Sequence, residues 1–96
     1  EHARHANSMA DRLAAGLAAA GLAPVWPVEA NEVFVPLPAR IDERLKAAGA
    51  SYYPWNTDAL ANGISLPRDA TLVRLVTSFA TTADDVDRFV ATVRAS

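Results

Sequence analysis

Cysteine is absent from this chain, which excludes disulfide bonds, thiolate metal ligands and a cysteine nucleophile. Lysine occurs once, at Lys46, so any Schiff-base chemistry in the chain would depend on that amine. Basic residues form no patch and the net charge is -2, so we expect no nucleic-acid partner. No apolar run approaches the roughly 18 residues of a membrane span, and the first residues lack the plan of a signal peptide. We therefore expect a cytoplasmic protein with no membrane partner.

The composition is that of a folded domain. Hydrophobic residues make up 51% of the 96 residues and charged residues 21%, which is enough for one modest core but not for two. We therefore expect a single domain over residues 1–96. The chain starts without an initiator methionine and enters a helical pattern at once, so we expect a fragment of a longer protein.

Hydrophobic periodicity predicts an α+β fold, with a small antiparallel or mixed sheet and helices packed on one face, in the order α-β-β-α-β-β-α. Residues 56–71 have the composition of a long irregular loop. Thr82 and Asp85 have the spacing of a capping box, and Gly21 and Gly49 are placed to end helices. The expected elements are a helix over 3–20, an extended segment over 24–28, a strand over 32–37, a helix over 38–48, an aromatic strand over 52–55, a strand over 72–77 and a helix after Thr82.

Arg74 is the most unusual residue, because it stands at the centre of the apolar strand LVRLVT. Strand alternation puts Arg74 on the face opposite the helices, flanked by Leu72 and Val76. Two interpretations of the side chain are open from the residues. Its stem lies across the sheet with the head in water, which is the commoner outcome, or its planar fork binds a carboxylate or phosphate.

Lys46 lies off the apolar stripe of its predicted helix, and Asp42 precedes it by four residues. That order favours a solvated ion pair, which keeps an amine charged and unreactive. We therefore expect no imine lysine in this chain.

Other candidate groups are incomplete. His2 and His5 could share a metal, but a third ligand is missing, so we expect them to be exposed. Glu29 and Glu32 bracket Asn31 and could do acid–base work, but solvation at a turn or strand edge is the stronger expectation. The sequence contains no Ser/His/Asp set, phosphate loop or metal-ligand spacing. We assign no catalytic, cofactor-binding or metal-binding residue to this chain.

Three stretches resemble the C-terminal small domain of bacterial low-specificity L-threonine aldolases. These are pyridoxal-phosphate (PLP) enzymes of fold type I in the β-eliminating lyase group. The stretches are VEANEVFV at 28–35, VRLVTSFATTADDV at 73–86, and HANSMA with RLA in the first predicted helix. The resemblance spans nearly the whole chain, but the segment between Trp55 and Leu72 is longer than the family pattern.

The resemblance implies a parent enzyme that cleaves β-hydroxy-α-amino acids such as threonine to glycine and an aldehyde. It places the PLP lysine and the ring-stacking histidine in a large domain outside this chain, so the fragment alone would be inactive and bind no cofactor. It assigns Arg74, in the Arg-Leu-Val-Thr motif, to the substrate carboxylate. Asn31 has a family counterpart at the strand entry without an assigned catalytic role. The implied partners are the large domain of the same chain, a small amino-acid substrate and further copies in a homo-oligomer.

Two other classes of function stay open. One is a free-standing α+β module that binds a small amino acid or other carboxylate. The other is an interaction or dimerisation domain that uses the apolar face beside Arg74. The helical start of the chain favours the enzyme domain, because regulatory modules usually begin at a turn or a strand.

Overall fold

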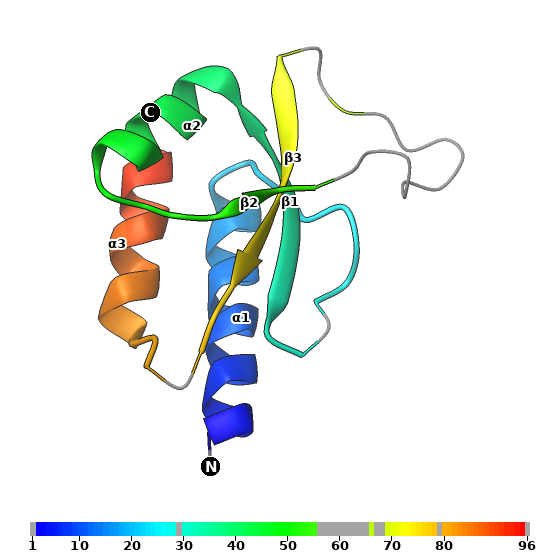
Figure 1. Ribbon diagram of the computed structural model, residues 1–96, viewed down its shortest axis with the longest axis vertical. Helices are drawn as coiled ribbons and strands as arrows, with labels where there is room; N and C mark the ends of the chain where they lie inside the picture. The colour runs from blue at the N-terminus through cyan, green and yellow to red at the C-terminus, as the bar shows by residue number, and fades with distance from the viewer. Residues whose placement is uncertain (1, 29, 56–65, 67–68, 79, 96) are drawn as a thin grey trace.

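The computed structural model describes residues 2–28, 30–55, 66, 69–78 and 80–95. The described strands form one antiparallel sheet in the order β1-β3-β2, and the helices α1 and α3 lie side by side (Figure 1). The expected α+β class is confirmed. The elements in chain order are α1 (His2–Ala19), β1 (Glu32–Pro38), α2 (Ala39–Ala47), β2 (Tyr53–Pro54), β3 (Ala70–Val76) and α3 (Ala83–Arg94).

The extended segment at 24–28 is not a strand, so the order within the described residues is α-β-α-β-β-α. The prolines at 24 and 27 have no N–H to donate to a ladder. One backbone hydrogen bond, from Val25 N to Phe34 O at 2.9 Å, holds the segment against β1. Most of the predicted 56–71 loop lies outside the described residues, and its last two residues belong to β3.

The edge strand β1 contains a proline without losing a ladder bond to β3. Phe34 turns its carbonyl outward to Val25. Pro36 lies two residues further along, so its nitrogen also faces away from the sheet.

The hydrophobic core lies between the helices and one face of the sheet. The buried residues of α1 recur at helical spacing and so share one face of the helix; they are Ala6, Met9, Ala10, Leu13 and Leu17. The aliphatic side chains that alternate toward the helices are almost fully buried. They are Val33, Val35 and Leu37 in β1 and Val73 and Leu75 in β3.

The helices α1 and α3 run in the same direction and pack closely. A Cβ added to Gly16 would lie 2.8 Å from Val90 Cγ2, so the absence of a side chain permits this approach. One turn earlier, Arg12 bridges to Asp87 across the same pair of helices. Gly16 thus permits the short distance between α1 and α3, and the Arg12–Asp87 ion pair joins the two helices at the surface.

Helix ends follow the predicted chemistry. Thr82 accepts a hydrogen bond from Asp85 N and donates its own backbone N–H to the Asp85 carboxylate, both at 3.0 Å. Gly21 and Gly49 adopt φ of 93° and 94°, the left-handed conformation that ends a helix without a Cβ penalty. The capping box and both glycine ends predicted from the sequence are confirmed.

The end of β3 is fastened to α1. Thr77 is buried, and its hydroxyl donates to the Ala6 carbonyl at 2.6 Å. The predicted helix-facing orientation of Thr77 is confirmed, and this bond fixes how β3 lies over α1. Within the described part of the chain, no helix is both long and apolar enough to cross a membrane.

Candidate functional site: an arginine on the open face of the sheet

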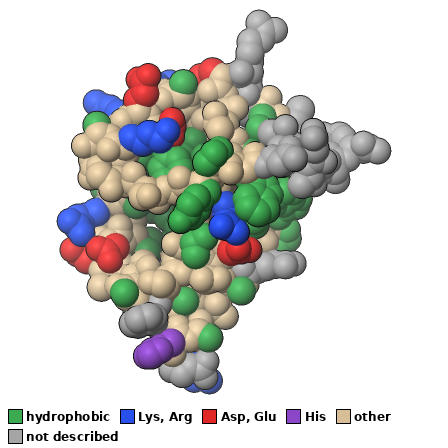
Figure 2. All heavy atoms as spheres, viewed as in Figure 1, with side chains coloured by type: hydrophobic (Ala, Val, Ile, Leu, Met, Phe, Trp, Pro, Cys, Tyr) green, Lys and Arg blue, Asp and Glu red, His purple; other side chains and the backbone are tan. Residues whose placement is uncertain are grey.

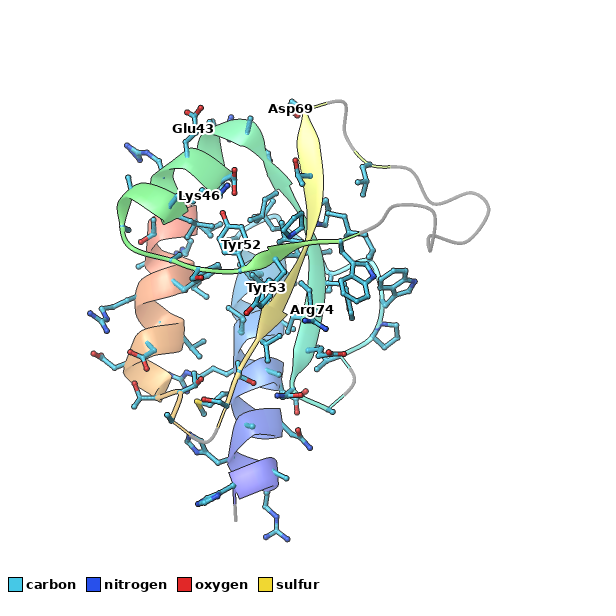
Figure 3. All side chains as sticks on the ribbon, viewed as in Figure 1. Glu43, Lys46, Tyr52, Tyr53, Asp69 and Arg74 are labelled. Atoms are coloured by element: carbon cyan, nitrogen blue, oxygen red, sulfur yellow. The ribbon has the colours of Figure 1, made fainter. Side chains whose placement is uncertain are left out.

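The face of the sheet opposite the helices carries the candidate site; we call it the open face. Arg74 stands at the middle of the central strand β3, with Phe34 of β1 and Tyr53 of β2 directly opposite it. Figure 3 shows Tyr53 and Arg74 close together where β2 crosses in front of β3. The predicted direction of Arg74, away from the helices, is therefore confirmed by the core positions of its neighbours Val73 and Leu75.

Aromatic rings surround the guanidinium. Its Cζ lies 4.8 Å from the ring centroid of Trp55 and 5.4 Å from that of Tyr53, within cation–π range. Phe34 meets Trp55 edge to face at 5.2 Å, and Trp26 meets Phe34 in the same manner at 4.9 Å. Figure 2 shows hydrophobic side chains gathered around one basic and one acidic group on this face. The arginine is thus held over a small aromatic platform.

Glu32 supplies the acidic group. Its Oε1 lies 3.2 Å from Arg74 Nη1, and the two side chains are 37% and 29% exposed. The head of Arg74 is therefore neither fully in water nor fully desolvated. From the sequence, Glu32 was expected to be solvated at a turn or strand edge. Its ion pair with Arg74 was not predicted. The signal was present in the alternation that puts Glu32 on the same side of β1 as Phe34, but the register with β3 was needed to join it to Arg74.

The donors of Arg74 are only partly used. Its Nε is buried and has no hydrogen-bond partner among the described residues. Arg12 offers the contrast within the same molecule, because its Nε and Nη2 both donate to the Asp87 carboxylate, at 2.9 and 2.8 Å. That side-on pair shows the geometry that a guanidinium adopts when a carboxylate saturates it. Arg74 instead reaches the Glu32 carboxylate through one nitrogen, Nη1, at the longer distance of 3.2 Å.

Lys46 lies elsewhere, on α2 (Figure 3). Its Nζ is 3.3 Å from Asp42, and the side chain is 64% exposed. The Tyr52 hydroxyl donates to the same carboxylate, and burial followed by this bond raises the pKa of Tyr52. The predicted ion pair is confirmed. An exposed, paired ammonium lacks the desolvation that an imine-forming lysine needs, so the residues present do not fit a PLP linkage.

The histidines on α1 do not form a metal site in the described residues. Across 2–28, 30–55, 66, 69–78 and 80–95, no cluster of three or more candidate ligands occurs. His5 is exposed, as expected, and its Nε2 contacts the Thr81 carbonyl. This contact helps to hold the loop before α3 against α1.

Asn31 closes the end of the β1–β3 ladder. Its side-chain Nδ2 donates to the Thr77 carbonyl at 2.7 Å. Its backbone carbonyl accepts from Thr77 N at 3.0 Å. These two hydrogen bonds give Asn31 a structural task at the end of the sheet. Glu29 lies outside the described residues.

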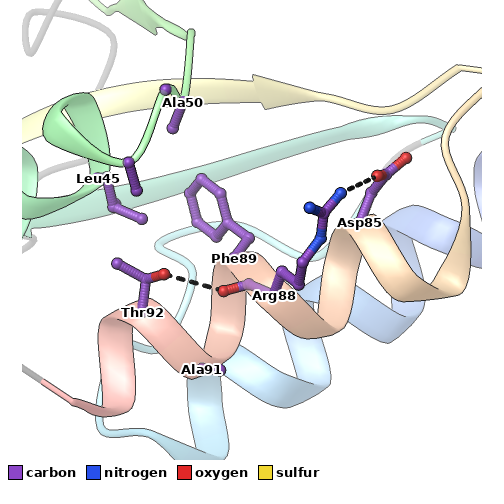
Figure 4. A pocket seen from close by; sticks show the side chains of 9 residues that line it. Leu45, Ala50, Asp85, Arg88, Phe89, Ala91 and Thr92 are labelled. Carbon is purple, nitrogen blue, oxygen red and sulfur yellow. Dashed lines mark hydrogen bonds and ion pairs between the residues drawn. The ribbon is translucent and has the colours of Figure 1, made fainter.

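A second concave region lies between α2 and α3 and has a volume of about 580 Å³ (Figure 4). The charged residues that line it, Arg88 and Asp85, pair with each other: Arg88 Nη2 lies 2.9 Å from Asp85 Oδ1. Thr92 donates to the Arg88 carbonyl at 3.0 Å. Leu45 and Phe89 supply apolar lining. Neither Arg74 nor Lys46 lines it.

The chain is similar to a protein of known structure. No protein-family model matches the chain, and no curated protein sequence matches it. Among solved structures, the chain is similar to a threonine aldolase from Leishmania major, with 30% sequence identity and a TM-score of 0.77. The similarity covers 95% of this chain and 24% of that chain. This chain therefore spans about a quarter of the length of the enzyme that it matches, and the resemblance to a threonine aldolase small domain is confirmed in fold and in sequence.

Proposed function

We propose that this chain is the small, substrate-carboxylate-binding domain of a PLP-dependent L-threonine aldolase. The observation that carries the proposal is the similarity to the Leishmania enzyme over 95% of the chain at 30% identity. The reaction divides a β-hydroxy-α-amino acid between Cα and Cβ. L-Threonine yields glycine and acetaldehyde: the hydroxyl proton leaves as the new aldehyde carbonyl forms, and Cα, which keeps the electron pair of the broken bond, takes up a proton. PLP supplies the electron sink for such bond cleavage.

PLP belongs to the remainder of the polypeptide in this proposal, because Lys46 does not fit the linkage. The residue of this chain that takes part is Arg74. It is a permanent cation on an aromatic platform, and a planar fork of this kind suits a carboxylate. Holding the carboxylate fixes one substituent of Cα and so limits the directions in which the Cα–Cβ bond can point. Misplacement of a reacting bond costs on the order of a hundredfold in rate.

The test is steady-state kinetics of the complete polypeptide that contains this chain. Arg74→Lys keeps the charge and removes the fork, and Arg74→Ala removes both. A hydrogen bond between charged partners is worth about 1.5–3 kcal/mol, so we expect kcat/KM for L-threonine to fall on the order of tenfold to a hundredfold. PLP absorbance should persist in both variants. Arg40→Lys, an exposed arginine on α2, is the matched control and should behave as the parent. Unchanged kcat/KM in Arg74→Ala would remove Arg74 from the site.

A free-standing carboxylate-binding module makes a different prediction. In that case the 96-residue chain alone would bind glycine with saturable heat, and Arg74→Ala would abolish the signal. The aldolase-domain proposal expects no such heat from the isolated chain, because one arginine of a divided site binds too weakly to saturate. Calorimetry of the chain with glycine separates the two.

A further inference from the structure

Arg74 already has a carboxylate partner inside the chain. The Arg74–Glu32 pair is close to electroneutral, so a second carboxylate that approaches the guanidinium meets a group whose charge is partly compensated. It also meets the negative charge of Glu32 itself. A substrate carboxylate and Glu32 therefore compete for the same cation.

Groups other than Glu32 also position the guanidinium. Trp55 and Tyr53 lie against it, and the strand beneath is fixed by pairing with β1 and β2 on both sides. Leu72, two residues earlier on the same face, is fully buried. Removing the Glu32 charge would leave these contacts in place.

We propose that Glu32 is an internal carboxylate that occupies Arg74 when substrate is absent and lowers the affinity of the site for the substrate carboxylate. This inference rests on the proposed function of Arg74. Glu32 keeps the cation compensated on its aromatic platform in the empty site and gives way, wholly or in part, when a substrate carboxylate arrives. It thus sets substrate affinity without contacting the reacting bond.

The experiment uses the complete polypeptide and the isosteric variant Glu32→Gln, which removes the charge and keeps the shape. Partly exposed ion pairs of this kind contribute little, so we expect KM for L-threonine to fall roughly two- to fivefold, with kcat unchanged. The dissociation constant of glycine, measured by calorimetry, should fall by the same factor. The difference should shrink at high ionic strength, because salt screens exposed charges. Glu43→Gln on α2 removes an equal charge away from Arg74 and should change neither value.

Two further variants keep the test decisive. Glu32→Asp retains the charge but shortens the side chain, and should lie between the parent and Glu32→Gln. In the Arg74→Ala background, the effect of Glu32→Gln should shrink, because the cation for which the two carboxylates compete is gone.

The results separate the two proposals. A raised or unchanged KM in Glu32→Gln, together with a raised KM in Arg74→Lys, overturns the inference about Glu32 and leaves the role of Arg74 intact. An effect of Glu32→Gln that is undiminished in the Arg74→Ala background also overturns it. An unchanged kcat/KM in Arg74→Ala overturns the proposed role of Arg74 itself.

Discussion

The two faces of one sheet differ in chemistry although they alternate along the same strands. The helix-covered face is aliphatic, and Val35 and Leu37 are completely buried there. The open face carries aromatic rings, an arginine and a glutamate, and Tyr53 on it is 61% exposed. The helix-covered face therefore buries most of the aliphatic core, whereas the open face carries a cation among aromatic rings. A guanidinium that keeps an unused donor on such a face is suited to binding a carboxylate.

The largest effect should come from breaking the helix-covered face. Leu37→Ala removes a fully buried side chain from β1 and leaves a cavity, so we expect the free energy of unfolding to fall by about 2–5 kcal/mol. Tyr53→Ala on the open face should cost well under half of that, because the ring is mostly exposed. Chemical denaturation of the two variants measures the difference. Equal losses would show that both faces carry the fold.

A smaller effect should come from the start of α3, which helps to cover the helix-side core. Thr82→Ala removes the side chain that accepts from Asp85 N, and the loss of an N-cap costs about 1 kcal/mol. Thr82→Ser keeps the hydroxyl and should restore nearly all of the stability. A thermal melt in which Thr82→Ser is as unstable as Thr82→Ala would contradict the assignment of the cap.

Acid should weaken the same helix start. The backbone hydrogen bond from Thr82, followed by the contact with Arg88, lowers the pKa of Asp85 below its ordinary value of 3.8. The unfolded chain then takes up this proton first as the pH falls, so the stabilisation is complete above about pH 3.8 and is lost as the pH falls through the lower folded value. Unfolding should show a shallower acid dependence in Asp85→Asn than in the parent. The same slope in both would exclude Asp85 as a contributor.

The smallest effect should come from the surface pair of Arg12 and Asp87. The bond to Arg12 lowers the pKa of Asp87, yet both side chains are at least half exposed and screened by water. Arg12→Lys should leave the denaturation midpoint close to that of the parent. A loss as large as that of Thr82→Ala would mean that the α1–α3 edge depends on the ion pair rather than on the close approach at Gly16.

Local chemistry made most of the fold predictable from the sequence. Apolar periodicity located α1 and α3, the Thr82–Asp85 spacing identified the cap, and alternation placed Arg74 on the face opposite the helices. The segment at 24–28 was predicted as extended and forms no strand, because two of its residues cannot donate to a ladder.

The candidate site was less predictable, because its partners come from separate strands. Glu32 and Trp55 reach Arg74 only through the antiparallel register of β1 and β2 with β3. No spacing within one segment encodes that meeting. The sequence therefore identified the arginine but neither its carboxylate partner nor its aromatic platform.

We propose that the open face holds the substrate carboxylate through Arg74. The most direct measurement is a crystal structure of the complete polypeptide with glycine bound. We expect carboxylate oxygens within hydrogen-bond distance of Arg74, about 2.7–3.2 Å, with the Glu32 contact lengthened or broken. A glycine carboxylate held by other residues, with Arg74 still on Glu32, would contradict it.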